Sequence, residues 1–484
     1  MILAAALRLA TLDLQSFWYD EAFTPVHVLH PSLWATLRSV VHTENTPPLW
    51  YVIAWADSRV LGTGEVALRL PSALAGIATV PVAWAIGREL TGRRVTAIAT
   101  AMLVAVNPLL VWYSQEARAY GLFVLLAAVA MLCFLRALRQ PTPGRMAAFA
   151  LSGSLALLSH YFAVFLLIPM VIWLAWVPTR RRAALPAIGA LALVGLALLP
   201  LISAQGGHGT QWIGRWALTS RLQAIPQYYL TDYYGASLGH GIELLVALPI
   251  LAGLGLGLWR VLTPREERSA LIALAIAAGG ILIPVVLVAF GADYLAPRNL
   301  VGAMIPVTAL IAIVVPSQRA GRVGIALAAT VAIAFLAISV DVNLSPRLQR
   351  GNWRDLARAL SVPAGGAAST AGRTLAGSMG GMRVITTVEL GAAPLEYYLP
   401  QLRKLQPGGA VTLREIDEVG YAPLRPSAGE PPAPGFRLLD RLDIDGLISY
   451  RFVSPIPRAV SETTLRRHTI TLAHPEVLVP AGSG

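Results

Sequence analysis

The chain has 484 residues, of which 56% are hydrophobic and 13% are charged, so a soluble globular protein is excluded and a polytopic membrane protein is predicted. The formal net charge is +12, but the basic residues fall mainly in short loops between apolar segments, a pattern of membrane orientation rather than of nucleic-acid binding. The single cysteine, Cys133, lies in an apolar segment, which excludes an intramolecular disulfide and redox chemistry as the main activity.

The N-terminal stretch is apolar but short. Residues 1–12 contain Arg8 and cover about 18 Å of a hydrocarbon core that is ~30 Å thick. We therefore expect half a span, and no cleavable signal peptide, because a basic leader and a small-residue cleavage site are both missing. Two adjacent acids, Asp20 and Glu21, follow directly. Charge at a membrane surface is costly, which makes this pair a candidate functional site.

Two aromatic-rich segments come next, at residues 31–41 and 47–61. They are too short to span a bilayer and are typical of interfacial helices that lie along the membrane. From residue 67 onward, apolar runs alternate with arginine-bearing loops, which we expect to be cytoplasmic. The runs cover residues 67–87, 95–113, 120–135, 146–177, 183–203, 241–259, 269–290, 299–316 and 323–340.

The run 146–177 has arginine loops at both ends, so it must cross the membrane an even number of times. We predict a hairpin of two short spans that meet near His160 and Tyr161 and face a cavity. With this pair and the first half-span, we expect about eleven transmembrane helices. The N-terminus is then inside, and residues 341–484 are outside.

The longest outer connection, residues 204–240, contains Trp212, Trp216, Tyr228, Tyr229, Tyr233 and Tyr234. It is either an aromatic belt at the interface or a wall for lipid or sugar. We divide the chain into a transmembrane domain, 1–340, and a small extracytoplasmic α/β domain, 341–484. In the second domain we predict strands at 384–388, 411–416 and 447–453, and a helix at 391–399.

Four motifs, in this order, carry a family resemblance: the acidic pair, Pro47–Tyr51, Arg69–Gly76 and Trp112–Tyr120. Together they resemble the GT-C superfamily of membrane glycosyltransferases, in the branch of the protein O-mannosyltransferases and lipid A aminoarabinose transferases. The resemblance implies a sugar donor carried on polyprenyl phosphate. It also implies that Asp20 and Glu116 are catalytic carboxylates, with Asp20 as the base and Glu21 orienting the backbone or binding acceptor. Either acid of the pair could instead be a helix N-cap.

Further outer-face residues could bind substrate. The leaving phosphate needs positive charge, for which Arg118 and Arg298 are candidates; Arg298 could instead anchor the interface. Glu116 could hold the acceptor, help to ligate a divalent cation or pair with Arg118. We also expect substrate contacts from His42, Glu44, Tyr113, His160 and Tyr161. No cofactor is firmly expected, although Mg²⁺ or Mn²⁺ is possible at these oxygen and nitrogen ligands.

These features predict a glycosyltransferase, inverting at the anomeric carbon, that acts in a bacterial plasma (inner) membrane with its site facing out. It would move a hexose such as mannose, or a pentose, to a hydroxyl of a glycan, lipid or protein. The alternative is a multi-span transporter or lipid flippase, which would place functional groups near the midplane of several helices. Here the acids gather at the outer loops instead.

Overall fold

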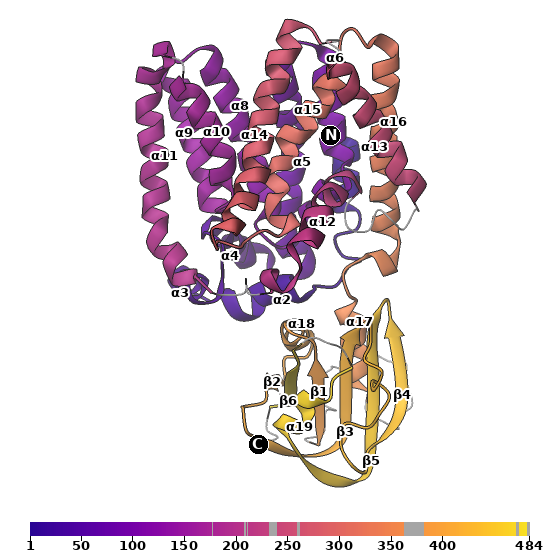
Figure 1. Cartoon of the computed structure of the whole chain (residues 1–484). Coiled ribbons are helices and arrows are strands. Elements are labelled where there is room, and N and C mark those ends of the chain that lie inside the picture. Colours follow the sequence, from indigo (N-terminus) through magenta and orange to yellow (C-terminus); the bar gives the residue numbers. More distant parts are fainter. Residues whose placement is uncertain are drawn as a thin grey trace. The chain divides into compact units, whose positions relative to one another are not determined.

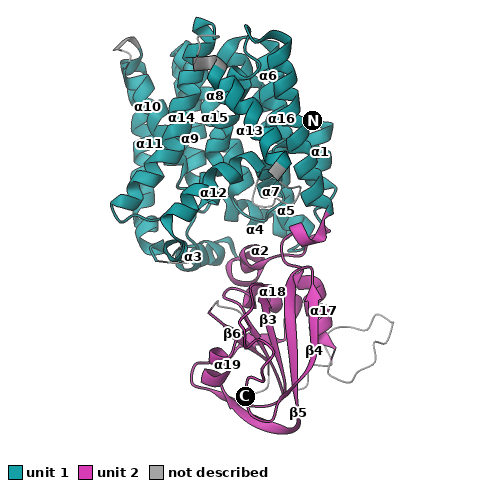
Figure 2. Ribbon diagram, turned by 45° about the vertical axis from the view of Figure 1, so that its right-hand side comes forward, with its two compact units in different colours: residues 1–12, 29–344 teal, residues 13–28, 345–484 magenta. Residues whose placement is uncertain are grey.

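The computed structural model describes residues 1–484 except 177, 208–209, 211, 232–239, 259–261, 363–381, 471–473 and 482–484. Tyr233, Tyr234 and most of the connector 363–382 therefore lie outside the described residues. The chain forms two compact units (Figure 2). One unit combines Met1–Leu12 with Leu29–Leu344, and the other combines Asp13–Val28 with Ser345–Gly484. The segment that carries the acidic pair thus packs with the C-terminal residues.

The first unit is a bundle of helices (Figure 1). Its α-helices are α1 (Ile2–Leu9), α3 (Leu33–Thr43), α4 (Leu49–Leu61), α5 (Glu65–Thr91), α6 (Arg94–Val106), α7 (Pro108–Ser114), α8 (Tyr120–Arg139), α9 (Pro143–Ser159), α10 (Ala163–Trp176), α11 (Pro178–Gln205), α12 (Leu218–Thr231), α13 (His240–Leu258), α14 (Pro264–Ala289), α15 (Met304–Val314) and α16 (Gly321–Leu344). The 3₁₀ segments η2 (Ile213–Arg215) and η4 (Pro297–Ala303) lie in its loops.

Each apolar run predicted from residue 67 onward is mainly helical where the structure describes it. Within the described residues, six helices are long and apolar enough to span a membrane, or seven if α6 and α7 are one bent span. The run 146–177 consists of two helices, α9 and α10, separated at His160–Phe162, as the arginine loops predicted. The chain is therefore an integral membrane protein, while the count of about eleven spans stays a prediction.

The two aromatic-rich segments form α3 and α4. Ser32 caps α3 by accepting a hydrogen bond from the Ala35 N–H at 3.1 Å. Trp34 of α3 is 69% exposed and lies 5.8 Å from the Arg38 guanidinium. An exposed tryptophan beside an arginine is typical of a helix at a membrane interface.

The span that precedes the second outer loop is broken between α6 and α7, which meet at 55°. Pro108 begins α7 without a backbone N–H, and Asn107 caps the helix by accepting from the Leu110 N–H at 3.0 Å. The break deprives carbonyl groups at the end of α6 of their helical partners inside an apolar bundle. One of these, Val106 O, accepts a hydrogen bond from Ser339 Oγ of α16 at 2.8 Å.

Arg8 of α1 satisfies two more of these carbonyl groups. Its guanidinium donates to Ala105 O at 2.8 Å and to Val104 O at 3.1 Å. It also donates to Ser114 Oγ of α7 at 3.2 Å, so it holds both halves of the broken span. Arg8 is fully buried, and it is therefore a structural donor inside the bundle rather than a charge at its surface.

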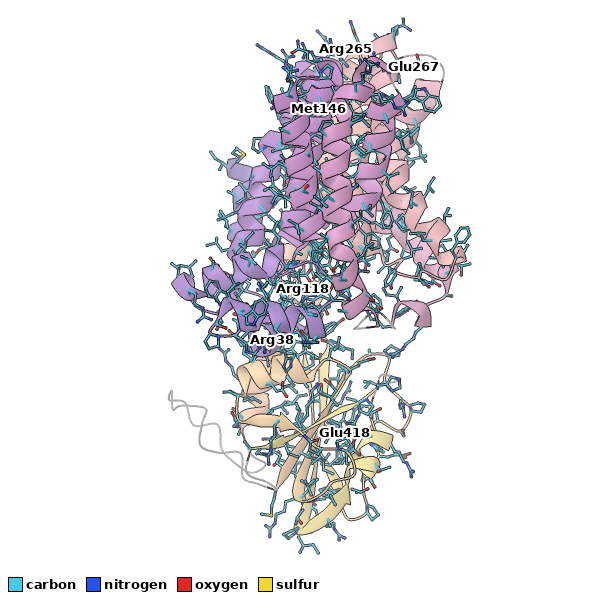
Figure 3. The ribbon with its side chains drawn as sticks, turned by 90° about the vertical axis from the view of Figure 1, so that its left-hand side faces the viewer. Arg38, Arg118, Met146, Arg265, Glu267 and Glu418 are labelled. Carbon is cyan, nitrogen blue, oxygen red and sulfur yellow. The ribbon has the colours of Figure 1, made fainter. Side chains whose placement is uncertain are left out.

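At the end of the bundle where α6 begins, Glu266 connects the loops that precede α14, α6 and α16. Its carboxylate accepts from Thr263 N–H at 2.9 Å in the capping box of α14, from Arg93 Nη1 at 2.6 Å and from Gln318 N–H at 2.9 Å. Figure 3 places Arg265 and Met146 at this end and Arg118 and Arg38 at the other. The predicted cytoplasmic loops next to Arg93, Met146, Arg265 and Gln318 are therefore at one end of the bundle.

The second unit contains a six-stranded sheet in the order β2-β6-β1-β3-β5-β4. The strands are β1 (Arg383–Thr387), β2 (Leu402–Lys404), β3 (Ala410–Tyr421), β4 (Arg437–Ile444), β5 (Leu447–Ser461) and β6 (Glu476–Pro480). Strands β1 and β3 are parallel, with Arg383 opposite Glu415, and the other pairs are antiparallel. The helices are α17 (Trp353–Ser361), α18 (Ala392–Tyr398) and α19 (Glu462–Arg467). The short α2 (Tyr19–Phe23) and the π-helical turn η1 (Thr24–Val28) also belong to this unit.

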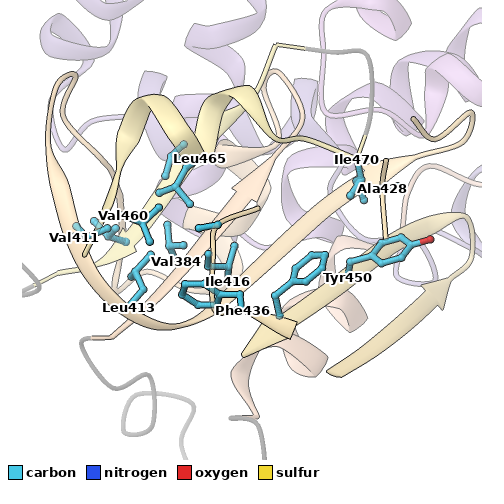
Figure 4. Packing of buried hydrophobic residues seen from close by; sticks show 14 of the residues in the cluster. Val384, Val411, Leu413, Ile416, Ala428, Phe436, Tyr450, Val460, Leu465 and Ile470 are labelled. Atoms are coloured by element: carbon cyan, nitrogen blue, oxygen red, sulfur yellow. The ribbon is translucent and has the colours of Figure 1, made fainter. Parts of the chain in front are cut away.

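Each face of the sheet has its own hydrophobic core, because successive strand residues point to opposite faces. One core gathers Ile416, Phe452 and Leu465, with other residues shown in Figure 4. The other packs Ile385 and Val419 against Trp353 of α17 and against α18. On the face of the sheet that α17 covers, a buried ion cluster forms in which Asp417 binds Arg383 Nε at 2.6 Å and Arg451 Nε at 2.9 Å. A buried carboxylate needs such partners.

The predicted strands and helix of this unit all occur, but β2, β4, β6, α17 and α19 were not predicted. A signal for β4 was present in the sequence. Asp445 and Gly446 have φ values of 53° and 94° and form the two-residue turn between β4 and β5. Asp-Gly favours such a turn because both positions need positive φ. Strand β4 is an exposed edge without a clear apolar face, so the hydrophobic pattern alone missed it.

His468 provides a pH test of this unit. Its Nδ1 lies 2.9 Å from Glu418 Oε1, and this hydrogen bond raises the pKa of His468. Burial and Arg425 oppose the increase, while the charges of Glu418 and Glu430 add to it. Because the folded pKa exceeds the ordinary value of about 6.5, the stabilisation is complete below that pH and is lost as the pH rises through the folded pKa. We expect the unfolding temperature of this unit to fall as the pH rises above 6.5.

The measurement is thermal unfolding of the full chain between pH 6 and 9. His468→Gln should flatten the decline, while His474→Gln, which changes an exposed histidine nearby, should preserve it. Burial also raises the pKa of Glu418. A fall of the unfolding temperature that begins below pH 6.5 therefore reflects ionisation of Glu418 and does not test His468. An unchanged slope in His468→Gln would contradict the assignment.

Candidate functional site

Asp20 and Glu21 lie in the first turn of α2, a five-residue helix. Glu21 is fully buried and Asp20 is half-buried. The N-cap position belongs to Trp18, whose backbone is extended, so the alternative role of either acid as N-cap is wrong. A carboxyl group in a half-buried position can reach an acceptor hydroxyl group, which is the geometry that a general base requires.

Glu116 lies in the loop between α7 and α8 and is 1% exposed. The preceding Gln115 fixes this loop to α1, because its Nε2 donates to Leu7 O at 3.0 Å and to Thr11 Oγ1 at 2.7 Å. Tyr113 is also buried, and its ring centroid lies 4.7 Å from that of Tyr120. The first helix and the broken span thus together position the second predicted carboxylate.

Arg118 and Glu44 form a two-pronged ion pair. Arg118 Nη1 donates to Glu44 Oε1 at 3.2 Å, and Nη2 donates to Oε2 at 3.0 Å. Glu44 is 3% exposed, so this charge is compensated inside the protein. His42, two residues earlier at the end of α3, is exposed. The structure therefore brings two of the predicted substrate-binding residues together and leaves His42 on the surface.

His160 stands at the turn between α9 and α10 and is buried among aromatic rings. Its ring stacks on Phe123 at 4.7 Å and lies 5.8 Å from Tyr120, which in turn contacts Tyr113. Its Nδ1 accepts a hydrogen bond from the Phe162 N–H at 3.2 Å, so that nitrogen carries no proton. These contacts are those of a packing residue that shapes the hairpin predicted from the sequence.

Tyr161, next to His160, joins a network that sequence reasoning missed. Its hydroxyl group donates to Gln205 Oε1 at 2.7 Å. Gln205 Nε2 in turn donates to Val40 O at 2.9 Å and to Thr46 O at 3.1 Å. The end of α11 thereby ties the α9–α10 turn to the loop that carries Glu44. A lone glutamine at the end of an apolar run was the signal available in the sequence.

Arg298 lies in η4, where its guanidinium stacks over the Trp212 ring with 4.8 Å between the carbon Cζ and the ring centroid. Such a cation–π contact orients a guanidinium while its edge can still donate hydrogen bonds. Trp212 belongs to the aromatic loop 204–240, for which the sequence left a belt and a wall open. Because Trp212 contacts Arg298, a predicted substrate-binding residue, we favour for Trp212 the role of lining a lipid or sugar site.

A second arginine supports the Arg298 loop. Arg221 of α12 binds Asp293 through two hydrogen bonds, Nη1 to Oδ1 at 2.6 Å and Nη2 to Oδ2 at 2.8 Å. Tyr229 of the same helix donates from its hydroxyl group to Leu300 O at 2.6 Å. Arg221 is 8% exposed and was not among the sequence-predicted residues, because no local motif marks it. Its role is to hold the segment before and within η4.

A divalent cation was left open by the sequence analysis. Among the described residues, no group of three histidine, cysteine, aspartate or glutamate side chains lies close enough to hold a metal ion. Of the residues suggested as ligands, Glu44 binds Arg118, and His160 is packed between aromatic rings.

Comparison with known proteins adds to this geometry. Residues 45–203 match the family model described as dolichyl-phosphate-mannose-protein mannosyltransferase. No curated protein matches the chain by sequence. The crystal structure of ArnT from Cupriavidus metallidurans bound to undecaprenyl phosphate is 12% identical, with a TM-score of 0.54 over 93% of this chain and 96% of that one. The apo state of the same protein is 13% identical, with a TM-score of 0.53 over the same shares.

The matched residues contain three of the four motifs on which the family resemblance rests, Pro47–Tyr51, Arg69–Gly76 and Trp112–Tyr120. The structural similarity extends through both units, since it covers nearly the whole of each chain. The resemblance stated from the sequence is therefore confirmed. The chain is a membrane protein with the fold of ArnT, and its residues 45–203 resemble the mannosyltransferase family.

Proposed function

We propose that the protein transfers a sugar from a polyprenyl-phosphate donor to an acceptor hydroxyl group on the outer face of the membrane. The observation that carries this proposal is the fold shared with ArnT, a protein crystallised with undecaprenyl phosphate. The mannosyltransferase family match adds support, because residues 45–203 include Glu116 and Arg118. A transporter or flippase without transferase activity is not favoured by either similarity.

In the proposed reaction, the acceptor oxygen attacks the anomeric carbon of the sugar. A carboxylate takes the proton of the acceptor, and the bond from the anomeric carbon to the phosphate oxygen breaks, which releases polyprenyl phosphate. We assign the base to Asp20, a half-buried acid near a helix N-terminus. Glu116 is assigned to the acceptor or to the developing charge on the sugar. The sugar is a hexose such as mannose, or a pentose, and the acceptor is a glycan, lipid or protein.

We assign the phosphate group of the donor to Arg298 rather than to Arg118. The guanidinium of Arg118 already forms two hydrogen bonds with the buried Glu44, so taking up phosphate would leave that carboxylate uncompensated. Arg298 is half-buried and stacked on Trp212, in a loop held by Arg221. An oriented guanidinium can bind two phosphate oxygens at once.

The arginine distribution supports an outward-facing site in a bacterial inner membrane. Arg265 and Met146, next to loops predicted to be cytoplasmic, are at the end of the helical unit opposite Arg118 (Figure 3). Positive charge collects on the cytoplasmic side of membrane proteins. The end that carries Arg118 and Glu116 is then outside, where lipid-linked sugars are consumed in the proposed reaction.

This orientation is tested with single cysteines in a Cys133→Ala background. Ser220→Cys in α12 and Gln406→Cys in the second unit, both at exposed positions, should react with a membrane-impermeant maleimide in intact cells. Gln140→Cys, after α8, should react only after permeabilisation. The reverse pattern would place the proposed site in the cytoplasm.

The role of Asp20 is tested by Asp20→Asn, which keeps the shape of the side chain but cannot take the proton. Transfer should fall by at least ~10²-fold while donor binding survives. Glu21→Gln is the matched control, and it should reduce transfer less than Asp20→Asn does. The assay is single-turnover transfer from a panel of radiolabelled polyprenyl-phosphate sugars. Activity of Asp20→Asn within a few fold of the parent would remove the assignment, and a larger loss in Glu21→Gln would move the base to the neighbouring acid.

Arg298→Ala should weaken donor use by ~2–5 kcal/mol in kcat/KM, because a charge-assisted contact to phosphate is lost. Arg298→Lys should recover only part, since an ammonium group lacks the planar fork. Trp212→Leu should raise the KM for the donor a few fold by removing the stacking contact. Trp216→Leu, which alters an exposed tryptophan of the same loop, is the control. Unchanged donor kinetics in Arg298→Ala would assign the phosphate to another cation.

A further inference from the structure

The segment that carries Asp20 and Glu21 packs against α18 inside the second unit. Three consecutive residues of α18 contact it on both sides of the acidic pair. Before the pair, the Phe17 N–H donates to the Tyr398 hydroxyl group at 2.7 Å, and the Phe17 ring meets the Tyr397 ring edge-on at 5.1 Å. After the pair, His27 Nε2 lies 3.3 Å from Glu396 Oε2.

The residues just before Phe17 are also built into this unit. Ser16 Oγ donates to Gly351 O at 2.9 Å and accepts from the Trp353 N–H at 2.9 Å. Gln15 Oε1 accepts from Arg350 Nη1 at 2.9 Å. Phe17 itself is fully buried. Residues 15–17 are thus an integral part of the second unit, although they come from the N-terminal region of the sequence.

The acidic pair needs this support, because its own helix cannot supply it. Helices shorter than about 12 residues are marginal in water, and α2 has five residues. It runs directly into the π-helical turn η1, a rare conformation that is frequent at functional sites. The shape of residues 19–28 must therefore come from tertiary contacts, and α18 provides those at both ends.

We propose that Glu396, Tyr397 and Tyr398 of α18 are positioning residues that hold the catalytic segment, residues 15–28. The inference rests on the proposed function, with Asp20 as the base. A general base acts only when it is held within hydrogen-bond reach of the proton it removes. Loosening α18 should therefore slow the chemical step while the binding of the lipid donor to the helical unit persists.

The experiment uses the full chain in lipid nanodiscs, with Tyr398→Phe, Glu396→Gln and the double variant Tyr397→Leu/Tyr398→Phe. Hydrogen–deuterium exchange should become faster in peptides that cover residues 15–28 and stay unchanged in those that cover α4. In the transfer assay, Tyr398→Phe should lower kcat roughly three- to tenfold, as expected for one lost hydrogen bond, with the donor KM within twofold of the parent. The double variant should lower kcat further than Tyr398→Phe alone.

Tyr450→Phe is the matched control, since it makes the same chemical change in the core on the other face of the sheet. It should alter neither the exchange of residues 15–28 nor kcat. Unchanged exchange in all three α18 variants would overturn the proposal, as would faster exchange with unchanged kcat. A parent chain that transfers no sugar from any donor would overturn the proposed function instead, and the exchange data alone would then decide whether α18 holds the segment.

Discussion

The helical unit depends on one constraint: a helix broken inside a bilayer must find new donors for the carbonyl groups that the break exposes. Here the break lies between α6 and α7, and Arg8 and Ser339 supply the donors from two other helices. Because Arg8 also binds Ser114, the direction of α7 is set by α1. Glu116 follows α7 directly, so a buried arginine at the start of the chain determines where this carboxylate lies.

The two predicted catalytic carboxylates belong to different compact units. Glu116 is part of the helical unit, whereas Asp20 belongs with the C-terminal sheet through the packing of residues 13–28. Residues 13–28 leave the helical unit and complete the second unit, so the two units are connected by the chain at both ends of this segment as well as after α16. The contacts of α18 around the acidic pair give a physical reason for keeping a folded domain after the last membrane helix.

Much of the architecture could be predicted from the sequence. Long apolar runs that end in arginine loops have one stable solution in a bilayer, a helix that satisfies its own backbone, and α5, α8, α11, α14 and α16 follow from that rule. The same rule, applied to equal charge at both ends of residues 146–177, predicted the α9–α10 hairpin. The acidic pair, Glu116 and Arg298 were found because their motifs stand at loops after or before such runs.

The sequence by itself therefore determined which segments are helices and where polar residues interrupt them, since both depend on local composition. Only the tertiary structure decided which partner each charge takes. Arg118 and Glu44 are separated by 74 positions, and Arg221 and Asp293 by 72, so no local pattern connects them. Likewise the pairing of Phe17 with Tyr398 spans 381 positions. Such contacts form because desolvated charges and buried backbone groups must be satisfied by whatever the fold brings near, which is a property of the packed chain.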